Sequence, residues 1–338
     1  MKRLTLASTL GLFTALPAMA DTLPGYDRFD LTAAHRARPI AASVLYPAAG
    51  RTYRAPIGDN PVFQPTMVLM GPAIAKGRHP LILLSHGSGG NADGLGWLTS
   101  GLVAKGAIVV AVNHPGSTSG DSSPRRSVDL GARAQDLSAA LDQILSDPAF
   151  APFIDPDRIS AVGFSLGGST VLGLAGLRFD GAMQAKNCTT GPDAADCGFF
   201  LKGGVDFAAS PGFSADARDA RIAEVVAIDP GFGGAVIDAS IGDVTAKLHL
   251  INLGDPQDSM RAVNVGPNGN NLAARLPGAS YAVVAPAHHF TFLGLCKDHA
   301  AEILAEEEDD PVCTDPKGAI RAVVHDRLIA EVASELNL

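Results

Sequence analysis

Beyond its first twenty residues, the sequence lacks any apolar run that approaches the length of a membrane helix, which is about 20 residues. It also lacks an excess of basic residues, because 26 Lys and Arg stand against 35 Asp and Glu, for a net charge of −9. An acidic balance argues against polyanion binding and favours solubility. We therefore expect no transmembrane segment in the mature chain and no nucleic-acid partner.

Cysteine is scarce as well. The four cysteines form two local pairs with the spacings CX8C and CX16C, without a CXXC motif or paired histidines nearby. This spacing does not fit the usual zinc sites, so we predict neither a metal nor a cofactor. Two disulfides, Cys188–Cys197 and Cys296–Cys313, are the simplest pairing, although four cysteines allow three pairings.

The first twenty residues differ from the rest. A basic MKR start, the apolar stretch LTLASTLGLFTAL and a closing Ala18-Met19-Ala20 have the organisation of a secretory signal peptide. An amphipathic first helix is the alternative interpretation. We predict a signal peptide over residues 1–20 and a secreted or periplasmic protein. Its removal takes away Lys2 and Arg3 and no acidic residue, so the net charge moves from −9 to −11.

The rest of the chain alternates between apolar runs and helical patterns. Two β-rich segments between residues 26 and 47 predict an opening hairpin or meander, followed by a Pro/Gly-rich stretch over 55–80. The apolar runs are 80–85, 107–112, 159–164, 224–229, 247–254 and 281–285, and the helical patterns lie around 93–104, 129–146 and 317–336. This alternation predicts a mostly parallel, doubly wound sheet flanked by helices. Without repeats or a long linker, residues 21–338 are expected to form one domain.

Residues 181–222 have no clean period and contain the first cysteine pair. They lie between the helix after residue 165 and the run 224–229, whose carboxyl end should face a site at the sheet edge. We expect a small cap insertion near the mouth of an active site. A plain surface excursion is the alternative.

One stretch carries a chemical signal. Gly163-Phe164-Ser165-Leu166-Gly167 is a GXSXG motif between a predicted strand and a predicted helix. In this context the glycines allow a tight, strained turn that exposes the serine hydroxyl at the sheet edge. We therefore predict that Ser165 is a nucleophile rather than a small residue of a Gly-rich turn.

A serine nucleophile needs a base, and in this fold the order along the chain is Ser, acid, His. His288 and His289 directly follow the last predicted strand, and position alone does not separate them. The acid should follow one of the strands between, which leaves Asp229 and Asp255. The other histidines after Ser165 lie in a strand, in a disulfide loop and in the last helix: His249, His299 and His325.

Acyl transfer also needs donors for the developing oxyanion. The backbone N–H of Leu166 follows the nucleophile at a helix N-terminus. The second donor should come from His86-Gly87-Ser88-Gly89-Gly90, which follows the run 80–85, and we assign the backbone N–H of Ser88.

These residues resemble those of the α/β-hydrolase superfamily, in particular the branch with platelet-activating-factor acetylhydrolases and predicted dienelactone hydrolases. The resemblance covers about residues 40–295. It rests on VLYP (44–47), HPLILLSHGSGG (79–90), VVAVNHPGS (109–117), DPDRISAVGFSLGG (155–168), VVAIDPG (225–231) and HHFTFLGLC (288–296). The resemblance implies Asp229 as the acid and His289, which precedes a phenylalanine, as the base. Dienelactone hydrolases proper carry a cysteine nucleophile where this chain has Ser165.

The sequence thus predicts an α/β-hydrolase fold and a serine esterase with a Ser-His-Asp triad. The expected substrate is a small-molecule ester, which is cleaved through an acyl-enzyme, and the enzyme is expected to be lipase-like or acetylhydrolase-like. A peptidase or amidase on the same fold is one alternative. A non-catalytic binding protein that has kept the fold is the other.

Overall fold

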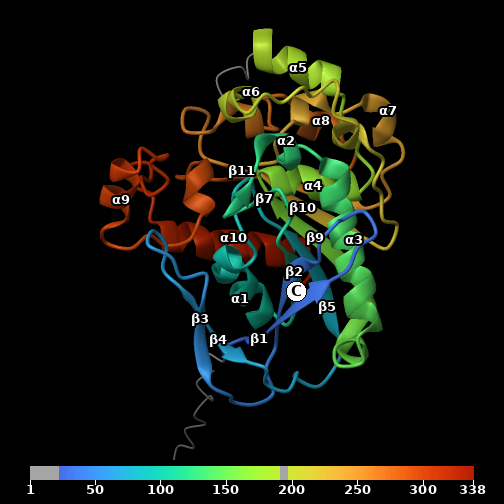
Figure 1. Ribbon diagram of the computed structural model, residues 1–338, viewed down its shortest axis with the longest axis vertical. Coiled ribbons are helices and arrows are strands. Elements are labelled where there is room, and N and C mark those ends of the chain that lie inside the picture. The colour runs from blue at the N-terminus through green and yellow to red at the C-terminus, as the bar shows by residue number, and fades with distance from the viewer. Residues whose placement is uncertain (1–22, 191–196) are drawn as a thin grey trace, which may run out of the picture.

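The computed structural model describes residues 23–190 and 197–338, and a ten-stranded sheet lies at its centre (Figure 1). The strands run in the order β12-β11-β10-β9-β5-β6-β2-β1-β4-β3. Their bounds are β1 (Gly25–Leu31), β2 (Ile40–Tyr46), β3 (Arg54–Ile57), β4 (Thr66–Met70), β5 (His79–Ser85), β6 (Ile108–Val112), β9 (Ile154–Phe164), β10 (Glu224–Ile228), β11 (Lys247–Leu253) and β12 (Ser280–Val284).

Six neighbouring strands, from β6 to β12 in that order, pair in parallel. β2 joins β6 in the antiparallel direction and also pairs antiparallel with β1, so the opening hairpin is present. The predicted mostly parallel sheet is therefore confirmed. Because parallel strands end at the same edge, the loops after β5, β9, β10, β11 and β12 meet there.

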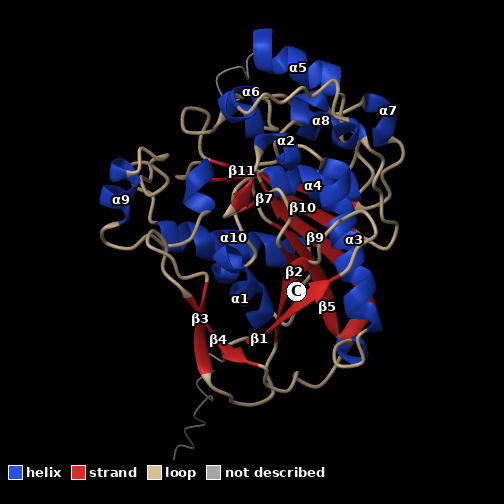
Figure 2. Cartoon of the chain, viewed as in Figure 1, coloured by secondary structure: helices blue, strands red, loops and turns tan. Residues whose placement is uncertain are grey.

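The strands form where the sequence is continuously apolar because helices cover both faces of the sheet. In β5, Leu81 and Leu83 belong to one core cluster, whereas Ile82 and Leu84 belong to the other. The first cluster includes residues of α3 (Leu130–Ser146) and α4 (Leu166–Leu174), and the second includes residues of α1 (Gly96–Ala104) and α10 (Arg321–Glu335). Figure 2 shows the sheet enclosed between these helices.

Six further α-helices lie within the described residues. They are α2 (Pro124–Ser127), α5 (Gly181–Thr190), α6 (Gly198–Lys202), α7 (Asp238–Ile241), α8 (Leu272–Arg275) and α9 (Ala300–Glu306). Within residues 23–190 and 197–338, no helix is long and apolar enough to span a bilayer.

Besides α5, α6, α7 and α8, three further regions contain elements that were not predicted. The Pro/Gly-rich stretch over 55–80 contains the strand β4 and most of β3, the loop over 114–127 contains a small hairpin and α2, and α9 lies between the last two cysteines. The hairpin consists of β7 (Ser117–Thr118) and β8 (Asp121–Ser122). Pro56 fits within β3 because β3 is the outermost strand, where proline breaks no shared ladder.

Both predicted cysteine pairs are bonded in the structure, with S–S distances of 2.05 Å for Cys188–Cys197 and 2.00 Å for Cys296–Cys313. The predicted signal peptide over 1–20 lies outside the described residues and stays a prediction.

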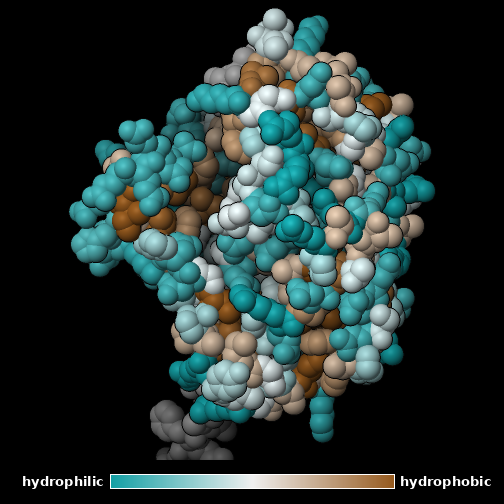
Figure 3. Space-filling model, viewed as in Figure 1, coloured by the Kyte–Doolittle hydropathy of each residue, from teal (hydrophilic) through white to brown (hydrophobic). Residues whose placement is uncertain are grey.

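The face drawn in Figure 3 is mostly hydrophilic, with apolar side chains gathered in patches, some of them on the lobe that carries α9. On the predicted insertion, Met183, Phe199 and Leu201 are the large apolar side chains that are exposed.

Candidate active site

Ser165 lies in a tight turn between β9 and α4. Its backbone has φ 56° and ψ −122°, a strained conformation for a residue with a side chain. A Cβ at Gly163 would lie 2.1 Å from the Gly167 carbonyl oxygen, and a Cβ at Gly167 would lie 2.0 Å from the Ser85 carbonyl oxygen. The two glycines are therefore required by close backbone contacts, which is the reason that the GXSXG pattern predicts such a turn.

The structure brings Ser165, His289 and Asp229 together in one hydrogen-bonded chain. Ser165 Oγ lies 3.1 Å from His289 Nε2, and His289 Nδ1 lies 2.9 Å from Asp229 Oδ2. Asp229 is 1% exposed and His289 is 6% exposed. Because a carboxylate accepts the Nδ1 proton, Nε2 is left to accept the serine proton.

Asp229 is held by a second set of contacts. Directly after β10 its backbone has φ 44°, in the left-handed region that residues with side chains rarely adopt. Asp229 Oδ1 accepts from Asn252 Nδ2 at 2.8 Å and from the Leu253 backbone N–H at 2.9 Å. These donors leave Oδ2 for His289 and fix the plane of the carboxylate.

Asn252 was not identified from the sequence, although it is a polar residue inside the apolar run 247–254. Besides Asp229, its side chain donates to the Val263 carbonyl and accepts from the Val265 backbone N–H. Tyr281 on β12 donates to Asn252 Oδ1 at 3.2 Å. Burial and then the Asp229 charge raise the pKa of Tyr281.

The two alternative residues, Asp255 and His288, lie away from this chain of contacts. Asp255 is exposed, and its carbonyl accepts from the backbone N–H groups of Asp258 and Ser259 in a turn. His288 Nε2 contacts the Thr314 carbonyl, and its Nδ1 accepts from the Phe290 N–H. Position along the chain leaves both alternatives open, and the geometry favours Asp229 with His289.

The remaining histidines after Ser165 contact partners outside this site. His249 pairs with Ser280 and Glu335, His299 is exposed beside Glu302, and His325 donates from α10 to two backbone carbonyls.

Aromatic rings surround the imidazole. Phe164 stacks on His289 with ring centroids 4.6 Å apart, and Phe290 meets the same ring edge-on at 5.4 Å. Phe292 stacks in turn on Phe164 at 3.9 Å. This packing fixes the orientation of the ring and shields one side of it from water.

The loop after β5 lies against the serine. A Cβ at Gly87 would be 3.2 Å from Ser165 Cβ, so the backbone of this loop approaches the nucleophile closely. Neither predicted oxyanion donor, the N–H of Ser88 or that of Leu166, has an acceptor within the part of the chain that the structure describes. Both groups are thus available to a ligand.

The predicted insertion lies at the same edge of the sheet as Ser165. Phe200 on α6 packs against Phe232, with ring centroids 5.5 Å apart, and Phe232 follows Asp229 by three residues. Phe207 and Phe213 extend this aromatic cluster. In Figure 1, α5 and α6 lie beyond the end of the sheet where β10 and β11 are labelled.

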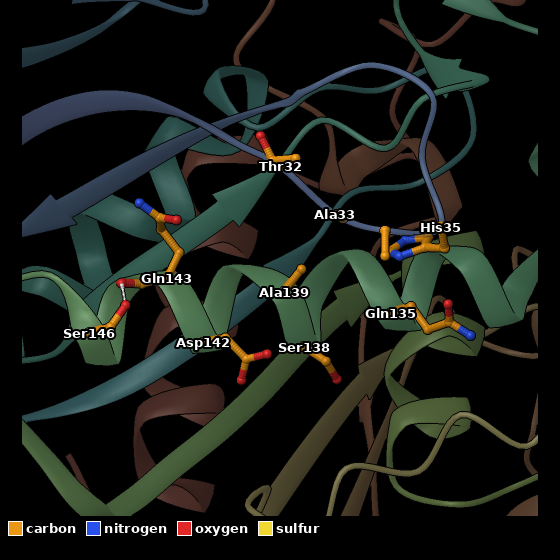
Figure 4. Close-up of a pocket in the computed structure, with 10 residues that line it drawn as sticks. Thr32, Ala33, His35, Gln135, Ser138, Ala139, Asp142, Gln143 and Ser146 are labelled. Atoms are coloured by element: carbon orange, nitrogen blue, oxygen red, sulfur yellow. Dashed lines mark hydrogen bonds between the residues drawn. The ribbon is translucent and has the colours of Figure 1, made fainter.

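The pocket drawn in Figure 4 is a separate feature. It has a volume of about 410 Å³ and lies between α3, which contributes Gln135 and Ser138, and the loop after β1, which contributes His35. None of the predicted site residues lines it. Among the described residues, no group of three or more His, Cys, Asp or Glu side chains is placed to hold a metal ion.

No family model and no curated protein matches the chain, whereas many solved structures resemble it. One is a ferulic acid esterase from Streptomyces cinnamoneus, with a TM-score of 0.58, 17% identity, and coverage of 96% of this chain and 91% of the other. Another is a candidate dipeptidyl aminopeptidase IV from Bacteroides ovatus, with a TM-score of 0.50, 11% identity, and coverage of 94% and 36%. A third is a dienelactone hydrolase from Anabaena variabilis, with a TM-score of 0.45, 13% identity, and coverage of 85% and 95%.

At these identities the likeness shows the fold. The chain has the α/β-hydrolase fold, as predicted. The narrower resemblance to the acetylhydrolase branch stays a prediction.

Proposed function

We propose that this chain is a serine hydrolase that cleaves carboxylic esters, with Ser165 as nucleophile, His289 as general base and acid, and Asp229 as the residue that orients His289. The observation that carries the proposal is the 3.1 Å contact between Ser165 Oγ and His289 Nε2, with Asp229 bonded to the opposite ring nitrogen. A strained, half-buried serine with a base at hydrogen-bond distance is the arrangement that nucleophilic catalysis needs.

The reaction has two halves. Ser165 Oγ attacks the ester carbonyl while His289 Nε2 takes the serine proton, and the same proton is then given to the leaving alcohol as the C–O bond breaks. In the second half, water loses a proton to His289 and attacks the acyl-enzyme. His289 returns the proton to Ser165, the acyl–serine bond breaks, and the acid leaves.

The two backbone N–H groups of Ser88 and Leu166 supply the oxyanion site in this proposal. Each lacks an acceptor among the described residues; Leu166 directly follows Ser165, and Gly87, which precedes Ser88, lies against the Ser165 side chain. Preorganised donors at this position stabilise the charge that develops on the carbonyl oxygen.

The insertion over 181–222 forms one wall of the substrate site in this proposal. It is attached there by the contact of Phe200 with Phe232, which is close in sequence to Asp229. Phe207 and Phe213 are buried in the core, and Phe200 is the half-buried ring of this cluster, which would offer an apolar acyl or aryl group a surface to pack on. The likeness to a ferulic acid esterase supports including a feruloyl ester among the substrates tested.

The test uses the purified chain from residue 21. Wild type, Ser165→Ala and the matched control Ser146→Ala, at the exposed end of α3, are assayed on p-nitrophenyl acetate, p-nitrophenyl butyrate and methyl ferulate. A fluorophosphonate probe followed by peptide mass spectrometry identifies the reactive serine. We expect wild type and Ser146→Ala to hydrolyse an ester and to be labelled on Ser165. Retained turnover in Ser165→Ala contradicts the assignment of Ser165 as nucleophile. Absent labelling of wild type favours the alternative of a non-catalytic binding protein.

A peptidase or amidase is the second candidate, because the structural likeness extends to a candidate dipeptidyl aminopeptidase IV. A p-nitrophenyl ester and the p-nitroanilide of the same acid separate the two functions. An esterase hydrolyses the ester far faster, whereas comparable rates on both favour the amidase.

We also propose that the protein is exported. The two disulfides support this because such bonds persist in oxidising compartments. Expression of the full chain, fractionation and sequencing of the N-terminus test it. A chain that begins at Asp21 in the periplasm or medium supports export, and an intact Met1 in the cytoplasm contradicts it.

A further inference from the structure

A buried polar cluster lies directly beneath the loop that carries Ser88, and the proposed reaction does not use it. Its members come from β5 and the following residue, from the segment after β6, and from α3, and each is at most 1% exposed. They are Ser85, His86, His114, Ser117, Arg133 and Asp136. Burying charge is costly unless each group is paired, so the arrangement of these contacts needs an explanation.

The proton on His86 has a defined place. His86 Nδ1 lies 2.7 Å from the Gly87 carbonyl oxygen, which can only accept, so Nδ1 carries the proton. His86 Nε2 lies 3.2 Å from the His114 backbone N–H, which can only donate, so Nε2 is unprotonated. Burial lowers the pKa of His86 well below its usual range, in agreement with a neutral ring. The ring is thus a fixed donor to Gly87.

Holding the Gly87 carbonyl sets the direction of the next N–H. In a planar trans peptide the carbonyl of one residue and the N–H of the following residue point in opposite directions. The Gly87 carbonyl accepts from His86 below the loop and from the Gly90 N–H at 3.2 Å. The Ser88 N–H therefore points away from the buried cluster, and Gly87 lies against Ser165.

Arg133 on α3 connects this loop to the nucleophile helix. Its Nη2 donates to the His86 carbonyl at 2.6 Å, and its Nε donates to Thr170 Oγ1 at 2.8 Å. Thr170 Oγ1 donates to the carbonyl of Leu166, the residue of the other proposed oxyanion donor, at 2.9 Å. Arg133 Nη1 also donates to Ser117 Oγ. One guanidinium thus bridges both segments that carry the oxyanion donors.

The carboxylate of this cluster, Asp136, is connected to Arg133 through His114 and Ser85. Asp136 Oδ2 accepts from His114 Nδ1 at 2.9 Å, and Arg36 donates to both carboxylate oxygens at 2.7 Å. Ser85 Oγ donates to His114 Nε2 at 2.9 Å and accepts from Arg133 Nη2 at 3.3 Å. Burial lowers the pKa of His114 to about 3, so it stays neutral. In the chain of hydrogen bonds that leads from Asp136 to Gly87, each donor therefore meets an acceptor.

We propose that Arg133 and His86 are positioning residues that preset the two oxyanion donors, the backbone N–H groups of Ser88 and Leu166, for the transition state. The inference rests on the proposed esterase function. It predicts that losing either side chain lowers kcat and weakens an oxyanion mimic by a similar factor, with little effect on KM.

The test compares His86→Leu, His86→Asn and Arg133→Met with His79→Leu. An asparagine amide can replace Nδ1 as donor to Gly87, whereas leucine cannot. His79 lies at the opposite end of β5 and also contacts backbone carbonyls, at 2.8 and 3.1 Å, so it is a matched control outside the site. The readouts are kcat, KM, the Ki of a trifluoromethyl ketone, whose serine adduct carries an oxyanion, and the melting temperature.

We expect His86→Leu and Arg133→Met to lose about 100-fold in kcat, the lower end of the loss for one oxyanion donor, and to raise Ki by a similar factor. His86→Asn should recover most of this loss. His79→Leu should lower the melting temperature and keep kcat and Ki. If His86→Leu does not fold, His86→Gln takes its place, because its amide lies at the Nε2 position and misses Gly87.

Two results overturn the inference. One is unchanged kcat and Ki in His86→Leu and Arg133→Met. The other is a loss in His79→Leu equal to theirs at equal melting temperature, which indicates a general structural role. A chain without hydrolase activity gives a different outcome, because wild type itself then neither hydrolyses esters nor reacts with the fluorophosphonate probe.

Discussion

The Asp229 carboxylate and the His289 imidazole meet at 2.9 Å between Oδ2 and Nδ1, although 60 residues separate them in the sequence. The contact forms because β10 and β12 end at the same edge of the sheet, separated there only by β11. Asn252, on that intervening strand, donates to the other oxygen of Asp229 and so keeps Oδ2 turned toward the histidine.

Replacing Asp229 tests this contact against the alternative acid. Asp229→Asn is expected to lower kcat on the order of 10⁴-fold, because the amide favours the wrong histidine tautomer. Asp255→Asn is the matched control, since Asp255 is exposed, and we expect less than about a threefold change from a surface substitution of this kind. Steady-state kinetics on one aryl ester check both. A larger loss in Asp255→Asn than in Asp229→Asn would show that the wrong acid was chosen.

Two alanine substitutions within α4 test the packing of the turn at Ser165. At Gly167 the new Cβ would lie 2.0 Å from the Ser85 carbonyl oxygen and 2.8 Å from that of His86, and backbone cannot move away cheaply. We expect Gly167→Ala to lose about 3 kcal/mol of stability or more. At Gly173 no other atom lies within 4 Å, apart from the nearby chain of its own helix, so Gly173→Ala should gain about 0.5–1 kcal/mol. Urea unfolding measures both, and equal effects would contradict the close backbone contacts at Gly167.

The fold was largely predictable because a parallel sheet buried on both faces leaves continuous apolar runs in the sequence. The run over 80–85, for example, is almost the whole of β5. β3 and β4 escaped prediction because they lie at the far end of the sheet, where Pro56 is tolerated and the strands are short. β7 and β8 have two residues each, too few to show a period.

The candidate site was predictable where the chemistry requires a fixed local pattern, as at Ser165. It was not predictable between His288 and His289, which are consecutive residues whose side chains point in different directions. Nor was it predictable between Asp229 and Asp255, which follow the neighbouring strands β10 and β11. Only the resemblance to known proteins favoured one of each pair. The cluster around Arg133 left no signal, because its members come from segments far apart in sequence and meet only through the sheet.

His325 should make the stability of the protein depend on pH. Its Nε2 donates to the carbonyls of Thr291 and Leu293 at 3.1 and 3.0 Å, and its ring stacks on Trp97. Burial lowers the pKa of His325 to about 4 in the folded chain, against about 6.5 when unfolded. The unfolded state therefore binds the proton first, and stability is lost as pH falls from about 6.5 to 4, by up to about 3 kcal/mol from this residue.

His325→Gln isolates that contribution, because its side-chain amide can still donate to the two carbonyls but does not titrate. We expect the variant to lose less stability than wild type between pH 7 and pH 4.5, while the difference between the two stays constant from pH 7 to 8. Urea midpoints at each pH measure this, and the other titrating groups cancel in the comparison. Parallel curves over the whole range would rule out His325 as a titrating group.

The disulfide Cys296–Cys313 should stabilise the segment that holds His289. The chain just after Cys313 contacts the turn at His289 twice, since the Thr314 carbonyl contacts His288 Nε2 and Asp315 Oδ1 accepts from Thr291 Oγ1 at 2.8 Å. With a sequence separation of 17, loop-closure entropy gives about 3 kcal/mol, so Cys296→Ser/Cys313→Ser should lose about that much stability. Cys188→Ser/Cys197→Ser, with a separation of 9, is the matched control and should lose slightly less.

Activity distinguishes the two disulfides more sharply than stability does. Only the Cys296–Cys313 pair is tied to the turn that carries the proposed base, so kcat on a small ester such as p-nitrophenyl acetate should fall in Cys296→Ser/Cys313→Ser at temperatures where both variants are folded. In Cys188→Ser/Cys197→Ser the same kcat should stay near that of wild type, because the contacts of His289 with Ser165 and Asp229 do not involve the insertion. Equal kcat in the two variants would mean that Thr314 and Asp315 do not position His289.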